Sequence, residues 1–199
     1  MIIAFLGRAG SGKSTAAKHL VEKYGATRYS IARGLKEMAK DLYGFTDEQV
    51  YGTQEQKETV EPRWGISPRQ AMQRLGAAAR KHLGEDVWIN ACVEEIGASD
   101  DPRVVIDDVR HLNEVELLRV MLGANVIKLV CPDAPECPNA QHASEAQVDM
   151  VEDRYLDEII ESPRTPGSVD LIRKLDECMQ GLEIEPVAVA TTAVPEVVA

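Results

Sequence analysis

The sequence predicts an α/β fold of three layers, in which a mostly parallel five-stranded sheet carries helices on both faces and a lid. Short apolar runs alternate with amphipathic stretches, which indicates strands that alternate with helices. The first apolar run passes directly into a glycine-rich loop. A length of 199 residues suits one domain. We expect this domain to span residues 1–182, with the lid at about 131–149 and a flexible tail at 183–199.

Short apolar runs, as is typical of strands buried in a parallel sheet, predict most of the strands, and two less apolar segments complete the set. The expected strands cover residues 2–6, 28–31, 104–106, 125–130 and 155–160. Apolar residues at helical spacing predict helices over 13–24, 32–42, 67–83, 86–96, 112–122 and 169–179. Ser67 and Pro68 mark one helix start, because serine caps a first turn and proline fits within it. The polar segment 44–65 is rich in turn residues and connects two helices.

Composition excludes several classes of protein. The net charge is −11 and the basic residues are spread out, which argues against binding to nucleic acid through its phosphates. No apolar run is long enough for a membrane span, and the first residues lack the features of a signal peptide. We therefore expect no membrane partner and a cytoplasmic protein, in the host cytoplasm if the source is viral.

Four cysteines show no C-x-x-C spacing, so reduced, inert thiols are the interpretation that we favour. Cys131, Cys137 and His142 lie close in sequence and form an alternative metal site. A structural zinc ion takes four ligands, and no fourth ligand is obvious.

The glycine-rich loop predicts binding of ATP and Mg²⁺. Residues 7–14 fit G-x-x-x-x-G-K-S/T, and they lie between an expected strand and an expected helix. Glycines let backbone N–H groups surround phosphate oxygens, and the helix adds its positive N-terminal end. Lys13 would lie between the β- and γ-phosphates, and Ser14 offers a hydroxyl to Mg²⁺. The expected nucleotide contacts are Gly7, Arg8, Ala9, Gly10, Ser11, Gly12, Lys13, Ser14 and Thr15.

Asp107-Asp108-Val109-Arg110 follow an apolar run, and the carboxyl ends of parallel strands face the ligand crevice. A carboxylate there can hold the waters of Mg²⁺, and we assign this role to Asp108, with Ser14 as the other metal residue. Arg110 can reach a substrate phosphate, so the expected catalytic residues are Lys13, Asp108 and Arg110. The alternative interpretation is a helix-capping aspartate with a surface arginine.

Several segments in order resemble the phage-type deoxynucleoside monophosphate kinases, a family with the P-loop kinase fold. The similarity spans roughly residues 1–175 and lies in 7–15, 35–38, 64–70, 84–88, 108–114 and 142–145. The resemblance implies transfer of the ATP γ-phosphate to a deoxynucleoside 5′-monophosphate, so that the partners are small-molecule nucleotides. It implies Arg69 and Arg110 as monophosphate contacts, with Lys36 as a further candidate. It places His142 and Glu145 in or beside the lid.

Other functions remain open at this point. A P-loop kinase for another small acceptor, of the dephospho-coenzyme A or phosphomevalonate type, is the first alternative. Dephospho-coenzyme A kinases have an Asp-x-Asp pair after the second strand, and residues 30–32 lack this pair. A non-catalytic nucleotide-binding switch is the second alternative, although no guanine-reading N-K-x-D segment follows the strand at 125–130. The sequence leaves a homodimer open.

Overall fold

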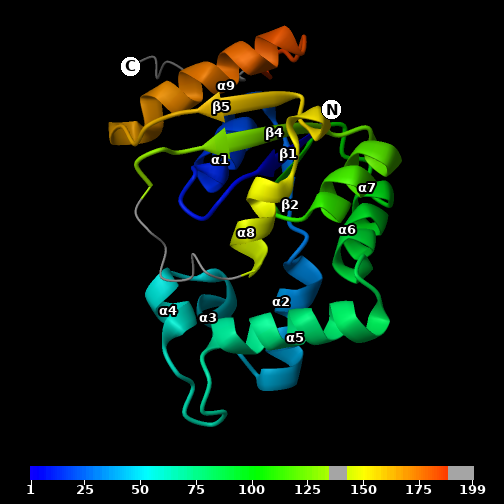
Figure 1. Ribbon diagram of the computed structural model, residues 1–199, viewed down its shortest axis with the longest axis vertical. Helices are drawn as coiled ribbons and strands as arrows, with labels where there is room; N and C mark the ends of the chain where they lie inside the picture. Colours follow the sequence, from blue (N-terminus) through cyan, green and yellow to red (C-terminus); the bar gives the residue numbers. More distant parts are fainter. Residues whose placement is uncertain (135–142, 188–199) are drawn as a thin grey trace, which may run out of the picture.

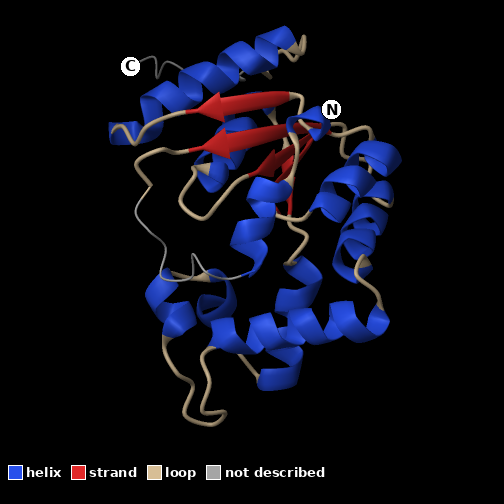
Figure 2. Cartoon of the chain, in the orientation of Figure 1, coloured by secondary structure: helices blue, strands red, loops and turns tan. Residues whose placement is uncertain are grey.

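The computed structural model describes residues 1–134 and 143–187, with side chains described from residue 146 onward in the second range. Its sheet has five strands in the order β2-β3-β1-β4-β5, and each neighbouring pair is parallel (Figure 2). The strands are β1 (Ile2–Leu6), β2 (Thr27–Tyr29), β3 (Val104–Val109), β4 (Asn125–Val130) and β5 (Glu158–Glu161). The predicted α/β class with a parallel five-stranded sheet is therefore confirmed.

Strand β1 lies at the centre of the sheet and is flanked by β3 and β4. Its last residue, Leu6, pairs with Val109 at the end of β3. The expected run 104–106 was too short, because pairing with β1 keeps the backbone extended through Asp107 and Asp108 to Val109. The loop after β1 therefore begins beside the acidic end of β3.

Two helix layers cover the sheet. Helices α1 (Lys13–Tyr24) and α9 (Val169–Gly181) pack on the face that presents Ile3 and Phe5. Helices α6 (Val87–Gly97) and α7 (Leu112–Leu122) pack on the other face, which presents Ala4 and Leu6. Alternate residues of β1 thus enter opposite cores, which explains its continuous apolar sequence.

Four helices lie at one end of the molecule (Figure 1). They are α2 (Arg33–Tyr43), α3 (Asp47–Tyr51), α4 (Gln54–Glu58) and α5 (Pro68–Leu83). A third cluster of apolar residues packs among α2, α3 and α5. Ser67 caps α5 and Pro68 lies in its first turn, as predicted. Helices α3 and α4 were missed in segment 44–65, because five-residue helices are too short to show a period. Each begins with a Thr-x-x-Gln capping box, which is the sequence signal for their starts.

The expected lid region contains helix α8 (Ala143–Met150), which the sequence did not predict. Val148 and Val151 are buried against the α6–α7 layer. Two 3₁₀ turns, Asp153–Tyr155 and Pro166–Ser168, flank β5. Tyr155 therefore precedes the last strand instead of starting it. No helix in the described ranges is both long and apolar enough to cross a membrane.

The first residues of the expected tail lie against the domain. Ile184 packs against the α1–α9 core. The side chain of Arg103 donates to the carbonyl of Glu185 at 2.7 Å, and the N–H of Val187 donates to the carbonyl of Lys23 at 3.1 Å. Packing in the described part thus continues to Val187, five residues beyond the expected boundary at 182.

Candidate active site

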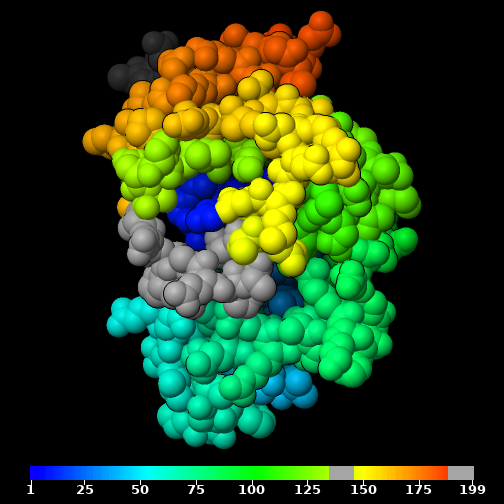
Figure 3. Space-filling model, viewed as in Figure 1, coloured from blue at the N-terminus to red at the C-terminus, as the bar shows by residue number. Residues whose placement is uncertain are grey.

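The glycine-rich loop joins β1 to α1 in a conformation that its glycines make accessible. Gly10 and Gly12 have positive φ angles of 81° and 93°. A Cβ atom on Gly7 would lie 2.7 Å from the carbonyl oxygen of Leu129, so a larger residue would displace backbone. Figure 3 shows this N-terminal segment in blue at the bottom of a hollow, bordered by the yellow-green end of β4 and by α8 in yellow. The loop is therefore backbone-lined and open to one face of the molecule.

Lys13 places a cation inside this loop. Its Nζ donates to the carbonyls of Gly7 and Arg8 at 2.5 and 2.7 Å, and the residue is 8% exposed. Burial, and next the positive charge of Arg110, lower the pKa of Lys13 to about 8, against the opposing effects of two neighbouring aspartates. Arg110 is thus near enough to Lys13 for the two charges to repel each other. Two adjacent cations at a helix N-terminus favour a polyanionic ligand.

Asp107, and not Asp108, faces the start of α1. The hydroxyl of Ser14 donates to Oδ2 of Asp107 at 3.2 Å. Arg28 on β2 holds the same carboxylate with two bonds, from Nε at 3.0 Å and from Nη2 at 2.6 Å. Asp107 is buried, so these contacts hold its two oxygens in place. Sequence reasoning missed Arg28, for which the adjacent aspartates were the only signal.

Asp108 has a different set of partners. Its carboxylate accepts from the hydroxyl of Ser30 at 2.6 Å and from the N–H groups of Ile31 and Ala32 at 2.9 and 3.0 Å. It therefore holds the loop between β2 and α2. Successive residues of a strand point to opposite faces, so only one of the two aspartates can face Ser14. The contact with Ser14 thus belongs to Asp107, and the metal role of Asp108 stays a prediction.

Arg110 leaves the end of β3 on a backbone fixed by Glu114. The N–H groups of Arg110 and His111 donate to Oε2 of Glu114 at 2.8 and 3.1 Å. Glu114 is 2% exposed and its other oxygen accepts from Arg80 at 2.9 Å. Arg80 and Glu114 thus act as positioning residues for the backbone at Arg110, a role that sequence reasoning missed.

The other expected phosphate contacts, Arg69 and Lys36, belong to the four-helix end of the molecule. Arg69 donates to Oε1 of Gln54 at 2.6 Å, and its Nε lies 2.6 Å from Oε1 of Glu58. The Nζ of Lys36 lies 4.8 Å from the centre of the Tyr51 ring. The structure therefore separates the expected cations into a pair beside the loop and a pair among α2–α5.

Helix α8 contacts the glycine-rich loop. The guanidinium of Arg8 pairs with Asp149, with Nε 3.2 Å from Oδ1. His111 contacts Gln147 on the same helix. Two of the residues predicted for the lid cannot be placed: His142 and the side chain of Glu145 lie outside the described part. Asp149 thus connects the expected lid to a predicted nucleotide contact.

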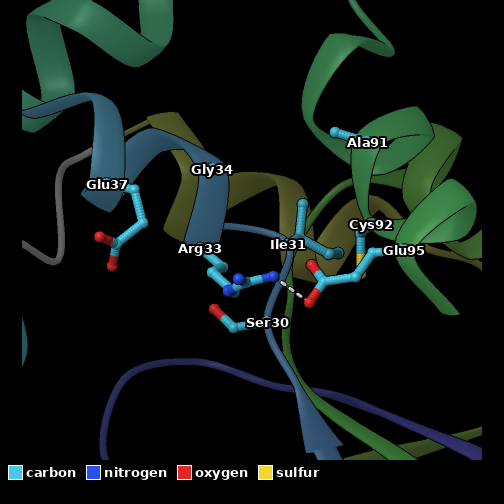
Figure 4. A pocket seen from close by; sticks show the side chains of 8 residues that line it. All are labelled: Ser30, Ile31, Arg33, Gly34, Glu37, Ala91, Cys92 and Glu95. Carbon is cyan, nitrogen blue, oxygen red and sulfur yellow. Dashed lines mark hydrogen bonds and ion pairs between the residues drawn. The ribbon is translucent and has the colours of Figure 1, made fainter. Parts of the chain in front are cut away.

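A cavity of about 220 Å³ lies where α2 meets α6, beside the loop that Asp108 holds (Figure 4). Arg33 and Glu95 form an ion pair at its edge. Its lining comprises Ser30, Ile31, Arg33, Gly34, Glu37, Ala91, Cys92 and Glu95. Burial raises the pKa of the Cys92 thiol to about 12, so the thiol stays protonated and unreactive at neutral pH.

The metal alternative at Cys131 gains no support within the described residues. Cys131 contacts Asp133 at 3.3 Å, and Cys137 and His142 lie outside the described part. No group of three or more metal-binding side chains occurs in residues 1–134 or among the side chains from 146 to 187.

Comparisons with known proteins identify relatives of the chain. No family model matches the chain. A protein of Acanthamoeba polyphaga mimivirus named as a deoxynucleotide monophosphate kinase is 34% identical over 148 residues, covering 66% of this chain and 75% of that protein. The deoxynucleoside-5′-monophosphate kinase of Escherichia phage T5 is 28% identical, covering 60% of this chain and 72% of that protein. A UPF0200 protein of Saccharolobus islandicus is 30% identical, and the chain spans 59% of its length.

Solved structures agree on the fold. The shikimate kinase of Acinetobacter baumannii superposes with a TM-score of 0.50 over 92% of this chain and 95% of the other, at 13% identity. That likeness supports the P-loop kinase fold alone, whereas the mimivirus relative shows the family. The chain belongs to the deoxynucleotide monophosphate kinases, a family of phosphotransferases, as its sequence predicts.

Proposed function

We propose that this chain transfers the γ-phosphate of ATP to the 5′-phosphate of a deoxynucleoside monophosphate, giving the diphosphate and ADP. The observation that carries the proposal is the buried amine of Lys13, which the glycine-rich loop holds near Arg110. The next residue, Ser14, contacts Asp107. In the reaction, an acceptor phosphate oxygen bonds to the γ-phosphorus while the bond from that phosphorus to the β,γ-bridging oxygen breaks. The acceptor phosphate is itself an anionic nucleophile, so no general base is needed.

The loop and its surroundings fit Mg²⁺ and ATP. Mg²⁺ binds oxygen ligands, and the Ser14 hydroxyl and the Asp107 carboxylate lie in contact. We assign these two residues to the metal, with Arg28 as the residue that orients Asp107. Bound Mg²⁺ would neutralise charge on the transferred group. Residues 7–15 would bind the nucleotide phosphates through backbone N–H groups.

Each cation of the site then has a role. Lys13 and Arg110 stabilise the charge that spreads over the transferred phosphoryl oxygens. Arg69 and Lys36 bind the acceptor. His142 and Glu145 keep their predicted place near the phosphates as a proposal. Alignment and charge neutralisation, rather than proton transfer, account for the acceleration.

The test is a coupled assay of ADP release with ATP, Mg²⁺ and each of dAMP, dCMP, dGMP and dTMP, with the diphosphate product identified by chromatography. We expect at least one monophosphate to stimulate ADP release and to yield its diphosphate. Lys13→Ala should lower kcat by at least about a hundredfold. Lys18→Ala, which removes an exposed amine from the same helix, is the matched control.

Two results would contradict the proposal. ATP binding without stimulation by any monophosphate would favour a switch. Stimulation by dephospho-coenzyme A or phosphomevalonate instead would favour a kinase for another acceptor.

A further inference from the structure

Helix α4 carries a lysine that the proposed function does not yet use. Lys57 is only partly exposed, and no side chain among the described residues forms a hydrogen bond or ion pair with its amine. A half-buried ammonium group without a partner loses hydration and gains no compensating contact. Such a group is costly for stability, which favours a role in binding.

The surroundings of Lys57 are positive. Arg69 of α5 contacts two residues of α4 that flank Lys57, namely Gln54 and Glu58. Lys36 of α2 approaches α3 through its contact with Tyr51. Burial, followed by the charges of Lys36 and Arg69, lowers the pKa of Lys57. Lys57 therefore lies near enough to Lys36 and to Arg69 for each of these charges to repel its own.

The charge of this cluster matches a phosphate. Lys36, Lys57 and Arg69 carry three positive charges, and Glu58 is the carboxylate paired with Arg69. The cluster thus keeps a net charge of about +2, which would balance the charge of about −2 on a monophosphate dianion. A structural salt-bridge network would instead give each cation a carboxylate partner, as Lys40 of α2 has in Glu37 and in Asp47 of α3.

We propose that Lys57 is a phosphate-recognition residue, and that Lys36, Lys57 and Arg69 together form the site for the 5′-phosphate of the acceptor. The inference rests on the proposed function and extends it, because it makes α4 part of the acceptor site. Binding of the phosphate offsets the repulsion that Lys57 experiences from Lys36 and Arg69. Arg69 can then exchange its contact with Glu58 for a forked contact with the phosphate.

The experiment compares Lys57→Met, Lys57→Arg and a control, Lys81→Met, which removes an exposed lysine from the last turn of α5. Isothermal titration measures affinity for dAMP, dCMP, dGMP and dTMP, for the four matching deoxynucleosides, and for ATP with Mg²⁺. We expect Lys57→Met to weaken monophosphate binding at least about tenfold, through loss of a charge-assisted contact. Affinities for ATP and for the deoxynucleosides should not change, and Lys57→Arg should retain most of the monophosphate affinity.

The outcomes separate this inference from the proposed function. Unchanged monophosphate binding by Lys57→Met overturns the inference alone. Equal weakening of ATP and monophosphate binding, with a lower Tm, indicates a structural role and also overturns it. A wild-type protein that binds ATP and none of the monophosphates overturns the proposed function and the inference together. In steady-state assays we expect a higher KM for the acceptor with little change in kcat, because the contact is formed before the transition state.

Discussion

At the residue scale, Lys13 combines the catalytic role that we propose for it with an electrostatic cost. The amine is enclosed by carbonyl oxygens of its own loop, and burial is the main cause of its lowered pKa. The protein thus holds a charge inside the loop before any phosphate is present. Preorganised charge of this kind lowers the reorganisation needed during phosphoryl transfer.

This cost predicts a dependence of stability on pH. The pKa of Lys13 is about 8 in the folded protein, and its ordinary value of 10.5 applies to the unfolded chain. Between these values the unfolded state binds more protons, so rising pH stabilises the wild type through this group. The free energy of unfolding of Lys13→Met should therefore exceed that of wild type by the largest amount near pH 7, and this difference should disappear by about pH 10. Urea denaturation of both proteins across this range measures the difference.

Lys18→Met controls for loss of an amine from the exposed face of the same helix. If the free energies of unfolding of Lys13→Met and wild type keep a constant difference from pH 7 to 10, the buried amine does not titrate in the range that we derive.

We expect substitutions of the two aspartates of β3 to have different effects, one on activity and one on stability. Asp107→Asn removes the charge beside Ser14, so we expect at least about a tenfold lower kcat and a higher Mg²⁺ requirement. Asp108→Asn weakens the contacts to the loop at Ser30–Ala32, so we expect a loss of about 1–3 kcal/mol in the free energy of unfolding. Mg²⁺ titration of activity and urea denaturation of each variant distinguish them. A variant pair with the two phenotypes exchanged would restore the metal role to Asp108.

At the element scale, α8 is connected to the glycine-rich loop by an exposed ion pair. The side chains of Arg8 and Asp149 are 56% and 49% exposed, and exposed pairs contribute only about 0–1 kcal/mol. The pair therefore contributes little to folding stability, and its main effect is to occupy the guanidinium of Arg8. If Arg8 binds the nucleotide as we propose, the Asp149 carboxylate competes with nucleotide phosphates for its guanidinium.

Asp149→Asn tests this competition. We expect tighter binding of ATP, by about two- to fivefold, because Arg8 no longer exchanges one anion for another. The Tm should change little. Titration with ATP measures the effect, and Asp153→Asn, in the 3₁₀ turn that follows α8, is the control. Weaker ATP binding would show that Asp149 instead holds α8 in a position that the nucleotide needs.

At the scale of the whole molecule, the chain after α9 returns to the sheet domain. Residues 183–187 add the apolar contact of Ile184 and two hydrogen bonds to the α1–β3 side of the protein. These contacts involve Lys23 in the last turn of α1 and Arg103 just before β3, whereas the glycine-rich loop precedes α1 and Asp107 lies near the end of β3. We therefore assign them a role in stability and none in the chemistry.

Two truncations separate these roles. A chain that ends after Leu182 should lose about 1–2 kcal/mol of stability and about 3–6 °C in Tm. A chain that ends after Val187 retains every described contact and should keep the Tm of wild type. The kcat/KM for the acceptor should be unchanged in both at 25 °C. If the chain that ends after Val187 folds but has a lower kcat/KM, residues 188–199 contribute to the activity.

The sequence by itself determined the class of fold, the loop and the family. Residues 2–6 and 13–24 were predicted at their observed bounds, because an unbroken apolar run and a helical period are local signals. The loop motif is also local, since glycine conformation and one lysine define it. Helices α3 and α4 were too short for such a signal, and only their capping boxes were readable.

Only the tertiary structure decided which charged groups meet. Strand alternation and pairing with β1 turn Asp107, and not Asp108, toward Ser14. Packing of α4 against α3 and α5 brings Lys57 near Arg69, and Lys57 also lies near Lys36 of α2. Contacts between residues distant in sequence depend on the register and angle of packed elements, and a single sequence carries no local signal for them. The grouping of the cations that we propose to bind phosphate follows from that packing.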